Sequence, residues 1–285
     1  MIDGVLVVDK PDGITSHDVV AIARRALGEK RIGHTGTLDP LATGVLALAI
    51  GRATRLVRFL TASDKEYVAT VRFGVATDTY DITGSPVATS QTRPTRGAVE
   101  EALRALSGEY LQMPPAYSAK KVGGTRAYAL ARRDEVVELK AVPVRVSRAD
   151  VLEAADDEVV IGITCSAGFY VRSFAHELGR LVGSGACLAA LRRTRSGEFG
   201  LAGAITVEQL QQTSVPALRP FDELLAGFPA LRVDAGGRGR VAHGQEIDGT
   251  GVGPWTRVLD EEGHLLALAQ PSARPGFLHP SVVLI

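Results

Sequence analysis

One carboxylate stands out because it lies in a loop whose composition restricts the backbone. Asp39 sits between Leu38 and Pro40, in a stretch (residues 33–44) that holds three glycines and a proline. Proline steers the preceding residue away from helical backbone angles, and glycine lets a backbone approach a ligand closely. A carboxylate held in this way could act as a nucleophile or as a general base. An Asp-Pro pair alone is usually only a turn, so the surrounding residues must show whether Asp39 is a catalytic residue.

The residues around Asp39 form a long motif that favours a catalytic role. Gly-His-Thr-Gly-Thr-Leu-Asp-Pro-Leu-Ala-Thr-Gly, residues 33–44, closely resembles the catalytic loop of the bacterial TruB family of tRNA pseudouridine-55 synthases. Five further blocks resemble that family in the expected order: residues 4–13, 63–67, 77–81, 114–121 and 165–172. The resemblance covers about the first 200 residues of the chain.

The resemblance assigns roles residue by residue. It implies that Asp39 is the catalytic nucleophile, that Tyr67 packs on the flipped base, and that Arg172 pairs with the aspartate. The other substrate-binding positions that it implies are Tyr170, Leu191, Asp81, Lys121 and His34, the last filling the space that the base vacates. Taken alone, a strand tyrosine or a leucine such as Leu191 would be assigned to the core.

The chemistry is consistent with these residue types. Isomerising uridine to pseudouridine breaks a glycosidic bond and rejoins the base through carbon, so we expect no cofactor and no metal. The uridine must leave a folded loop, which costs a few kcal/mol, and an aromatic ring could offset this cost by stacking. An arginine beside the carboxylate would favour its charged form, and arginine suits a fixed pair better than lysine does.

Residue patterns around this loop predict an α+β (mixed α/β) fold. Apolar runs predict strands at residues 4–9, 44–50, 66–73, 142–152 and 159–165. Helical spacing predicts helices at residues 16–27, 95–106, 125–133 and 168–182, and residues 33–44 are expected to form a long loop. The family resemblance implies a central mixed, largely antiparallel sheet flanked by helices and loops.

A second, smaller unit is expected at the C-terminus. From about residue 228 the chain becomes rich in glycine, with short apolar runs at residues 256–259, 265–269 and 282–285 that predict short strands. We therefore divide the chain into a catalytic domain (1–227), with a tRNA-contacting insert at about residues 77–133, and a β-rich domain (228–285). The latter weakly resembles a PUA-type RNA-binding domain.

Charge and composition constrain the partners and the compartment. The formal net charge is zero, but basic residues gather in local clusters, including Arg192, Arg193 and Arg195, which could form a positive face for RNA. The two cysteines form no metal-binding pair, and no apolar run is long enough to cross a membrane. We expect a cytoplasmic monomer that binds the T-arm of tRNA without a guide RNA.

Two alternatives remain open at this stage. The same scaffold could serve a non-catalytic tRNA-binding or tRNA-folding protein, or a pseudouridine synthase that depends on a guide RNA. Other catalytic motifs are missing: the chain has no Walker loop and no Gly-x-Ser-x-Gly elbow, and Arg180 stands where a zinc-protease motif starting at His176 would need its second histidine.

Overall fold

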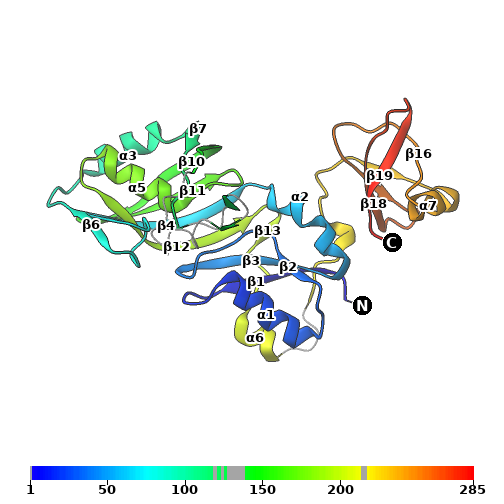
Figure 1. Ribbon diagram of the computed structural model, residues 1–285, viewed down its shortest axis with the longest axis horizontal. Helices are drawn as coiled ribbons and strands as arrows, with labels where there is room; N and C mark the ends of the chain where they lie inside the picture. Colours follow the sequence, from blue (N-terminus) through cyan, green and yellow to red (C-terminus); the bar gives the residue numbers. More distant parts are fainter. Residues whose placement is uncertain (1, 118–120, 123–124, 127–138, 213–216) are drawn as a thin grey trace.

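The computed structural model describes residues 2–285 except 118–120, 123–124, 127–138 and 213–216 (Figure 1). A ten-stranded sheet forms most of the N-terminal part. Its main path runs β14 (Ile205–Thr206), β1 (Gly4–Lys10), β3 (Ala42–Ile50), β12 (Ala186–Ser196), β4 (Lys65–Phe73), β11 (Glu158–Cys165), β10 (Val142–Ala154) and β7 (Gly108–Gln112). The remaining strands, β2 (Ile32–His34) and β13 (Phe199–Gly200), pair with β3 and β12.

The predicted mixed, largely antiparallel sheet is confirmed. Along the main path only β1–β14 and β3–β12 are parallel pairs. Strand β3 is buried on both faces: Leu46, Leu48 and Ile50 join the larger apolar cluster, whereas Val45 and Ala47 face a second cluster. A continuous apolar run is what a strand covered on both faces requires.

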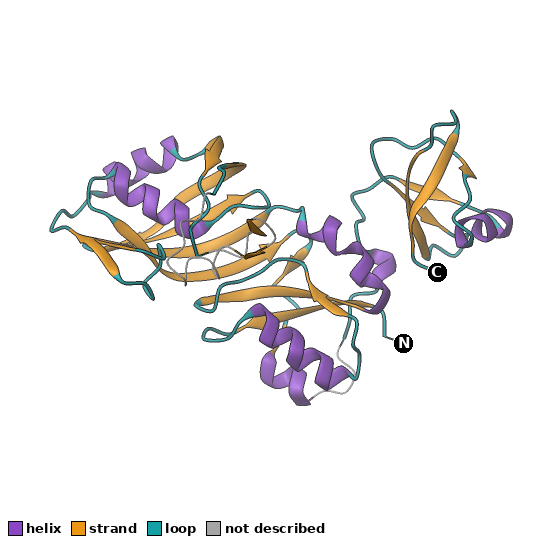
Figure 2. Ribbon diagram, in the orientation of Figure 1, coloured by secondary structure: helices purple, strands orange, loops and turns teal. Residues whose placement is uncertain are grey.

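Helices cover this sheet in two groups (Figure 2). Helix α1 (Ser16–Leu27) lies beside α6 (Val207–Gln212) near β1 and β3, whereas α3 (Arg96–Ala105) and α5 (Val171–Leu181) lie over the half formed by β10, β11 and β4. Thr15 and Asp18 form a capping box that fixes the start of α1. This start matters for the site because Ser16 is buried and faces the loop that carries Asp39.

A separate five-stranded sheet forms the C-terminal part, as the sequence predicted. Its order is β15 (Ala230–Arg232), β17 (Thr256–Leu259), β18 (Leu265–Pro271), β19 (Phe277–Val283) and β16 (Ile247–Asp248), with α7 (Ala235–Ala242) beside it. Leu259, Leu265 and Leu268 share an apolar cluster with Val45 of β3. The domain boundary at residue 228 remains a proposal.

Short elements connect these parts. The 3-10 helix η1 (Gly51–Leu56) runs into α2 (Val57–Thr61), and a second 3-10 turn, η2 (Phe221–Glu223), precedes the C-terminal sheet. Two hairpins, β5 (Val75–Thr77) with β6 (Pro86–Thr89) and β8 (Lys121–Val122) with β9 (Thr125–Arg126), complete the fold. Among the described residues, no helix has the length and apolarity that crossing a bilayer requires.

Three sequence predictions need correction. The helix expected at residues 125–133 is wrong where it can be judged, since Thr125–Arg126 form a strand; residues 127–133 lie outside the described part. The helix expected from residue 168 begins at Val171, because Gly168 has a φ of 83° and ends the preceding turn. The loop expected at residues 33–44 is shorter, since both its ends pair as strands β2 and β3.

Candidate active site

The loop between β2 and β3 is fixed at several points by groups from the N-terminal segment. The Ser16 hydroxyl accepts a hydrogen bond from the Leu38 amide (2.8 Å) and donates one to the Leu38 carbonyl (3.0 Å). The buried Lys10 Nζ donates to the Pro40 carbonyl at 3.2 Å, and the Gly13 amide donates to the same oxygen at 2.9 Å. Asp39, between these fixed residues, therefore has a defined backbone position.

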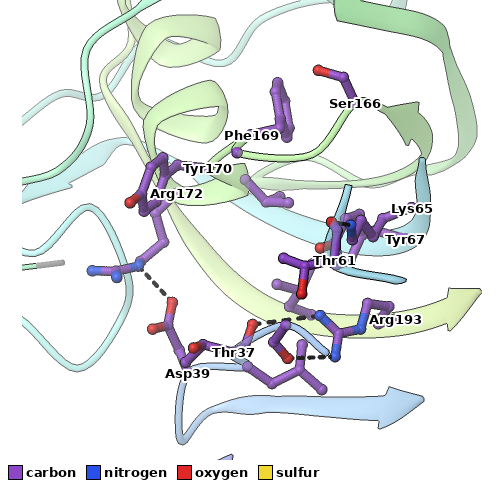
Figure 3. A pocket seen from close by; sticks show the side chains of 15 residues that line it. Thr37, Asp39, Thr61, Lys65, Tyr67, Ser166, Phe169, Tyr170, Arg172 and Arg193 are labelled. Atoms are coloured by element: carbon purple, nitrogen blue, oxygen red, sulfur yellow. Dashed lines mark hydrogen bonds and ion pairs between the residues drawn. The ribbon is translucent and has the colours of Figure 1, made fainter. Parts of the chain in front are cut away.

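Arg172 meets the Asp39 carboxylate from the first turn of α5 (Figure 3). Its Nε lies 2.8 Å from Asp39 Oδ2, although the N–H bond is not aimed at that oxygen, so the contact is an ion pair rather than a hydrogen bond. The arginine side chain is 7% exposed and the aspartate side chain 36%. The carboxylate therefore remains accessible, whereas its partner is enclosed.

The rest of the Arg172 guanidinium is held by two backbone carbonyls and a second carboxylate. Nη1 donates to the Thr79 carbonyl at 3.1 Å, Nη2 donates to the Tyr117 carbonyl at 2.9 Å, and Asp81 Oδ2 lies 3.6 Å from Nη1. Asp81 is itself buried and accepts hydrogen bonds from the Thr79 hydroxyl and the Thr83 amide. Asp81 thus contacts a different nitrogen of Arg172 from the one that Asp39 contacts, and it does not line the cavity described next.

A cavity of about 400 Å³ opens beside this ion pair, which is within the usual range for a small-ligand site. Its walls include five of the predicted site residues: Asp39, Tyr67, Tyr170, Arg172 and Leu191. They come from the loop, from β4, from the start of α5 and from β12. Adjacent strands β3, β12 and β4 thus bring together segments that are far apart in the sequence.

Tyr67 forms part of the wall across the cavity from Arg172 (Figure 3). It is 9% exposed, and burial, as the largest cause, raises the pKa of its hydroxyl. The phenol therefore keeps its proton at neutral pH. Its ring can offer a flat apolar surface to a ligand, while its hydroxyl can donate a hydrogen bond.

Two predicted site residues are not in the cavity wall, and a third cannot be placed. His34 lies on β2, where its Nδ1 accepts a hydrogen bond from the Gly36 amide at 3.3 Å. Burial, followed by the charge of Arg193, lowers the pKa of His34. Asp81 contacts Nη1 of Arg172 without lining the cavity, and the side chain of Lys121 is outside the described part of the chain.

Sequence reasoning missed two cations of the cavity wall, Lys65 and Arg193. Lys65 is 6% exposed, and burial lowers its pKa to about 8. Arg193 is 2% exposed, so assigning it to a solvent-facing basic cluster was wrong. Strand alternation was the available indication, because Lys65 shares a face with Tyr67, and Arg193 shares one with Leu191.

Comparisons with known proteins show the family of this chain. Residues 24–171 match the model of the TruB family pseudouridylate synthase N-terminal domain, and residues 172–226 match that of the tRNA pseudouridylate synthase B C-terminal domain. A tRNA pseudouridine synthase B from Solibacter usitatus is 42% identical over 99% of this chain and 100% of its own length. One from Thermobifida fusca is 43% identical over 99% of both chains.

Solved structures share the fold. A chain of an H/ACA RNP bound to a substrate RNA containing 2'-deoxyuridine aligns with a TM-score of 0.77 at 24% identity, covering 99% of this chain and 85% of the other. A chain of a Cbf5-Nop10-Gar1 complex aligns with a TM-score of 0.76 at 25% identity, with the same coverage. Since both family models and full-length relatives match, the chain belongs to the TruB family of tRNA pseudouridine synthases, which are isomerases.

Proposed function

We propose that this enzyme converts the uridine at position 55, in the T-loop of tRNA, to pseudouridine, with Asp39 as the nucleophile. The observation that carries the proposal is the Asp39–Arg172 ion pair at the edge of a cavity, where the aspartate is open and the arginine is enclosed. The guanidinium places a positive charge 2.8 Å from the carboxylate. A charged carboxylate facing a cavity of nucleobase size can attack a bound nucleoside.

The target uridine must leave its stack to reach this carboxylate. Flipping costs a few kcal/mol, and stacking on an aromatic ring returns about 1–3 kcal/mol per base. Tyr67 and Tyr170 supply rings in the cavity wall, and Leu191 supplies an apolar surface. His34, outside the cavity, is proposed to fill the space that the base leaves in the RNA.

The reaction needs no external reactant. Asp39 forms a bond to the nucleoside while the N1–C1' bond breaks and its electron pair stays with the uracil. The uracil then rotates within the cavity and bonds to C1' through C5, releasing the aspartate. The proton on C5 is lost, and N1 is protonated. Enclosure by Tyr67, Leu191 and Arg172 would keep the detached base from escaping.

The proposed partner is tRNA alone. The curated relatives named tRNA pseudouridine synthase B match this chain at about 40% identity over nearly its whole length, whereas the similar chains solved within larger complexes are 24–25% identical. We therefore propose a cytoplasmic monomer that needs no guide RNA. Contact with the T-arm is assigned to the insert at residues 77–133, including Lys121, and additional RNA contact to the PUA-like domain.

The test uses an unmodified tRNA transcript and its isolated T-arm stem-loop, with an anticodon stem-loop as the control RNA. Purified protein is added in buffer with a chelator, and pseudouridine is mapped by base-specific chemistry. We expect one modified T-loop uridine in the first two RNAs and none in the third. Modification elsewhere would reject the T-arm assignment; tRNA binding or refolding without modification would favour a non-catalytic or guided protein.

A further inference from the structure

Arg193 is among the largest fully buried side chains of the described residues, and its guanidinium contacts the loop that carries Asp39. Its Nε donates to the Val45 carbonyl at 2.7 Å. Its Nη2 and Nη1 donate to the carbonyls of Gly36 (3.0 Å) and Thr37 (3.4 Å). No ion pair joins this guanidinium to a carboxylate in the part of the chain that the structure describes. Its hydrogen bonds go to the loop and to the strand that follows it.

These acceptors lie on both sides of Asp39 in the sequence. Gly36 and Thr37 precede it (Figure 3), and Val45 follows it in β3, so one rigid plane holds both ends of the segment that carries the nucleophile. A guanidinium offers five donors in a fixed fork, whereas a lysine ammonium offers a compact charge on a flexible stem. Only the fork matches acceptors in these separated directions.

The backbone of Arg193 is equally constrained. It pairs with Gly44 in the parallel β3–β12 register. A Cβ on Gly44, whose φ is 100°, would lie 2.2 Å from the Arg193 carbonyl oxygen and 2.9 Å from its amide nitrogen. The two strands therefore approach so closely that the arginine has little room to shift. Across the antiparallel β12–β4 pair Arg193 stands opposite Tyr67, and both residues line the cavity.

We propose that Arg193 is a positioning residue of the reaction: its guanidinium holds the loop of Asp39 in its reactive arrangement. The inference rests on the proposed function, because its main assay measures pseudouridine formation. A second assay, hydrogen exchange, is independent of activity. Misplacement of a reacting group by about 1 Å can slow a reaction about 100-fold.

The main test compares Arg193→Lys with Arg180→Lys, the same change at a surface position of α5. Arg180 is 64% exposed and pairs with Glu177, so it serves as the matched control. We expect Arg193→Lys to slow single-turnover pseudouridine formation about 100-fold, with the tRNA Kd changed less than about threefold. In the same variant, the backbone amides of residues 36–39 and 41–42 should exchange faster, while Arg180→Lys should match wild type in every measurement.

Other outcomes separate the possible failures. A rate within about threefold of wild type, or a loss explained by the unfolded fraction, with loop exchange unchanged, would overturn the positioning role. If wild type forms no pseudouridine, the proposed function fails, and the exchange of the loop amides still tests the role of Arg193. If Arg193→Lys does not fold, the test uses the Nε–H resonance of Arg193 in the wild-type protein. Slow exchange of this proton with solvent supports the positioning role, and fast exchange rejects it.

Discussion

Arg172 contacts two carboxylates through different nitrogens: its Nε lies 2.8 Å from Asp39 Oδ2, and its Nη1 lies 3.6 Å from Asp81 Oδ2. Arg172 thus joins an accessible carboxylate to a buried one. Asp81 has no comparable access to the cavity, since its side chain is 6% exposed and its Oδ1 accepts hydrogen bonds from Thr79 and Thr83. Arg172 therefore contacts a buried carboxylate, Asp81, and the proposed nucleophile, Asp39.

Replacing Arg172 should accordingly reduce both stability and rate. Arg172→Met leaves Asp81 without its buried counter-charge, and breaking such a pair costs about 3–5 kcal/mol. Arg180→Met is the control on the same helix, because Arg180 is 64% exposed and pairs with Glu177 at the surface; its cost should be at most about 1 kcal/mol. Urea unfolding measures the free energy of unfolding of each variant, and equal losses in the two variants would contradict this role of Arg172.

Tyr67 is expected to contribute through its ring and through hydrogen bonding rather than as a base at neutral pH. Because burial raises its pKa, its phenol stays protonated. Tyr67→Phe should slow single-turnover formation about tenfold, as expected for one lost hydrogen bond, and Tyr67→Ala should cost about 3–5 kcal/mol of stability. Tyr110→Phe is the control, since burial also raises the pKa of Tyr110, which lies outside the active-site cavity. An unchanged rate in Tyr67→Phe would assign the tyrosine to packing alone.

His34 should make the enzyme sensitive to acid. Burial lowers its pKa below the ordinary value of about 6.5, so below that pH the unfolded chain binds the proton more readily than the folded one. The free energy of unfolding therefore falls as pH falls through this range, and protonation of Nδ1 removes the acceptor for the Gly36 amide. His34→Gln keeps an acceptor without titrating and should flatten the acid limb of the rate between pH 5 and 7. His243→Gln, an exposed control in the C-terminal part, should keep that limb; a limb that persists in His34→Gln would contradict the assignment.

Much of the cavity was predictable from the sequence because its residues fall in recognisable blocks. Asp39, Tyr67, Tyr170 and Arg172 lie in those blocks, Leu191 was named from the family resemblance outside them, and the structure places all five around one cavity. The strands were predictable for a simpler reason, since runs such as residues 44–50 are apolar throughout and suit a strand that is covered on both faces.

Arg193 shows where sequence reasoning fails. Arg192, Arg193 and Arg195 form one basic run, and alternation indicates only that neighbours face opposite sides of the strand. Which side is buried depends on the parallel pairing of β12 with β3 and on the close approach at Gly44. These are contacts between segments about 150 residues apart in the sequence, and no local pattern encodes them.

The most direct test of the account is Asp39→Asn, assayed by pseudouridine mapping on an unmodified tRNA transcript. The amide keeps the size of the side chain but removes the charge that attacks the nucleoside and attracts Arg172. Asp156→Asn, in the exposed turn between β10 and β11, is the matched control. We predict pseudouridine at the T-loop uridine with wild type and Asp156→Asn, and none with folded, tRNA-binding Asp39→Asn. Modification by Asp39→Asn at the wild-type rate would show that Asp39 is not the nucleophile.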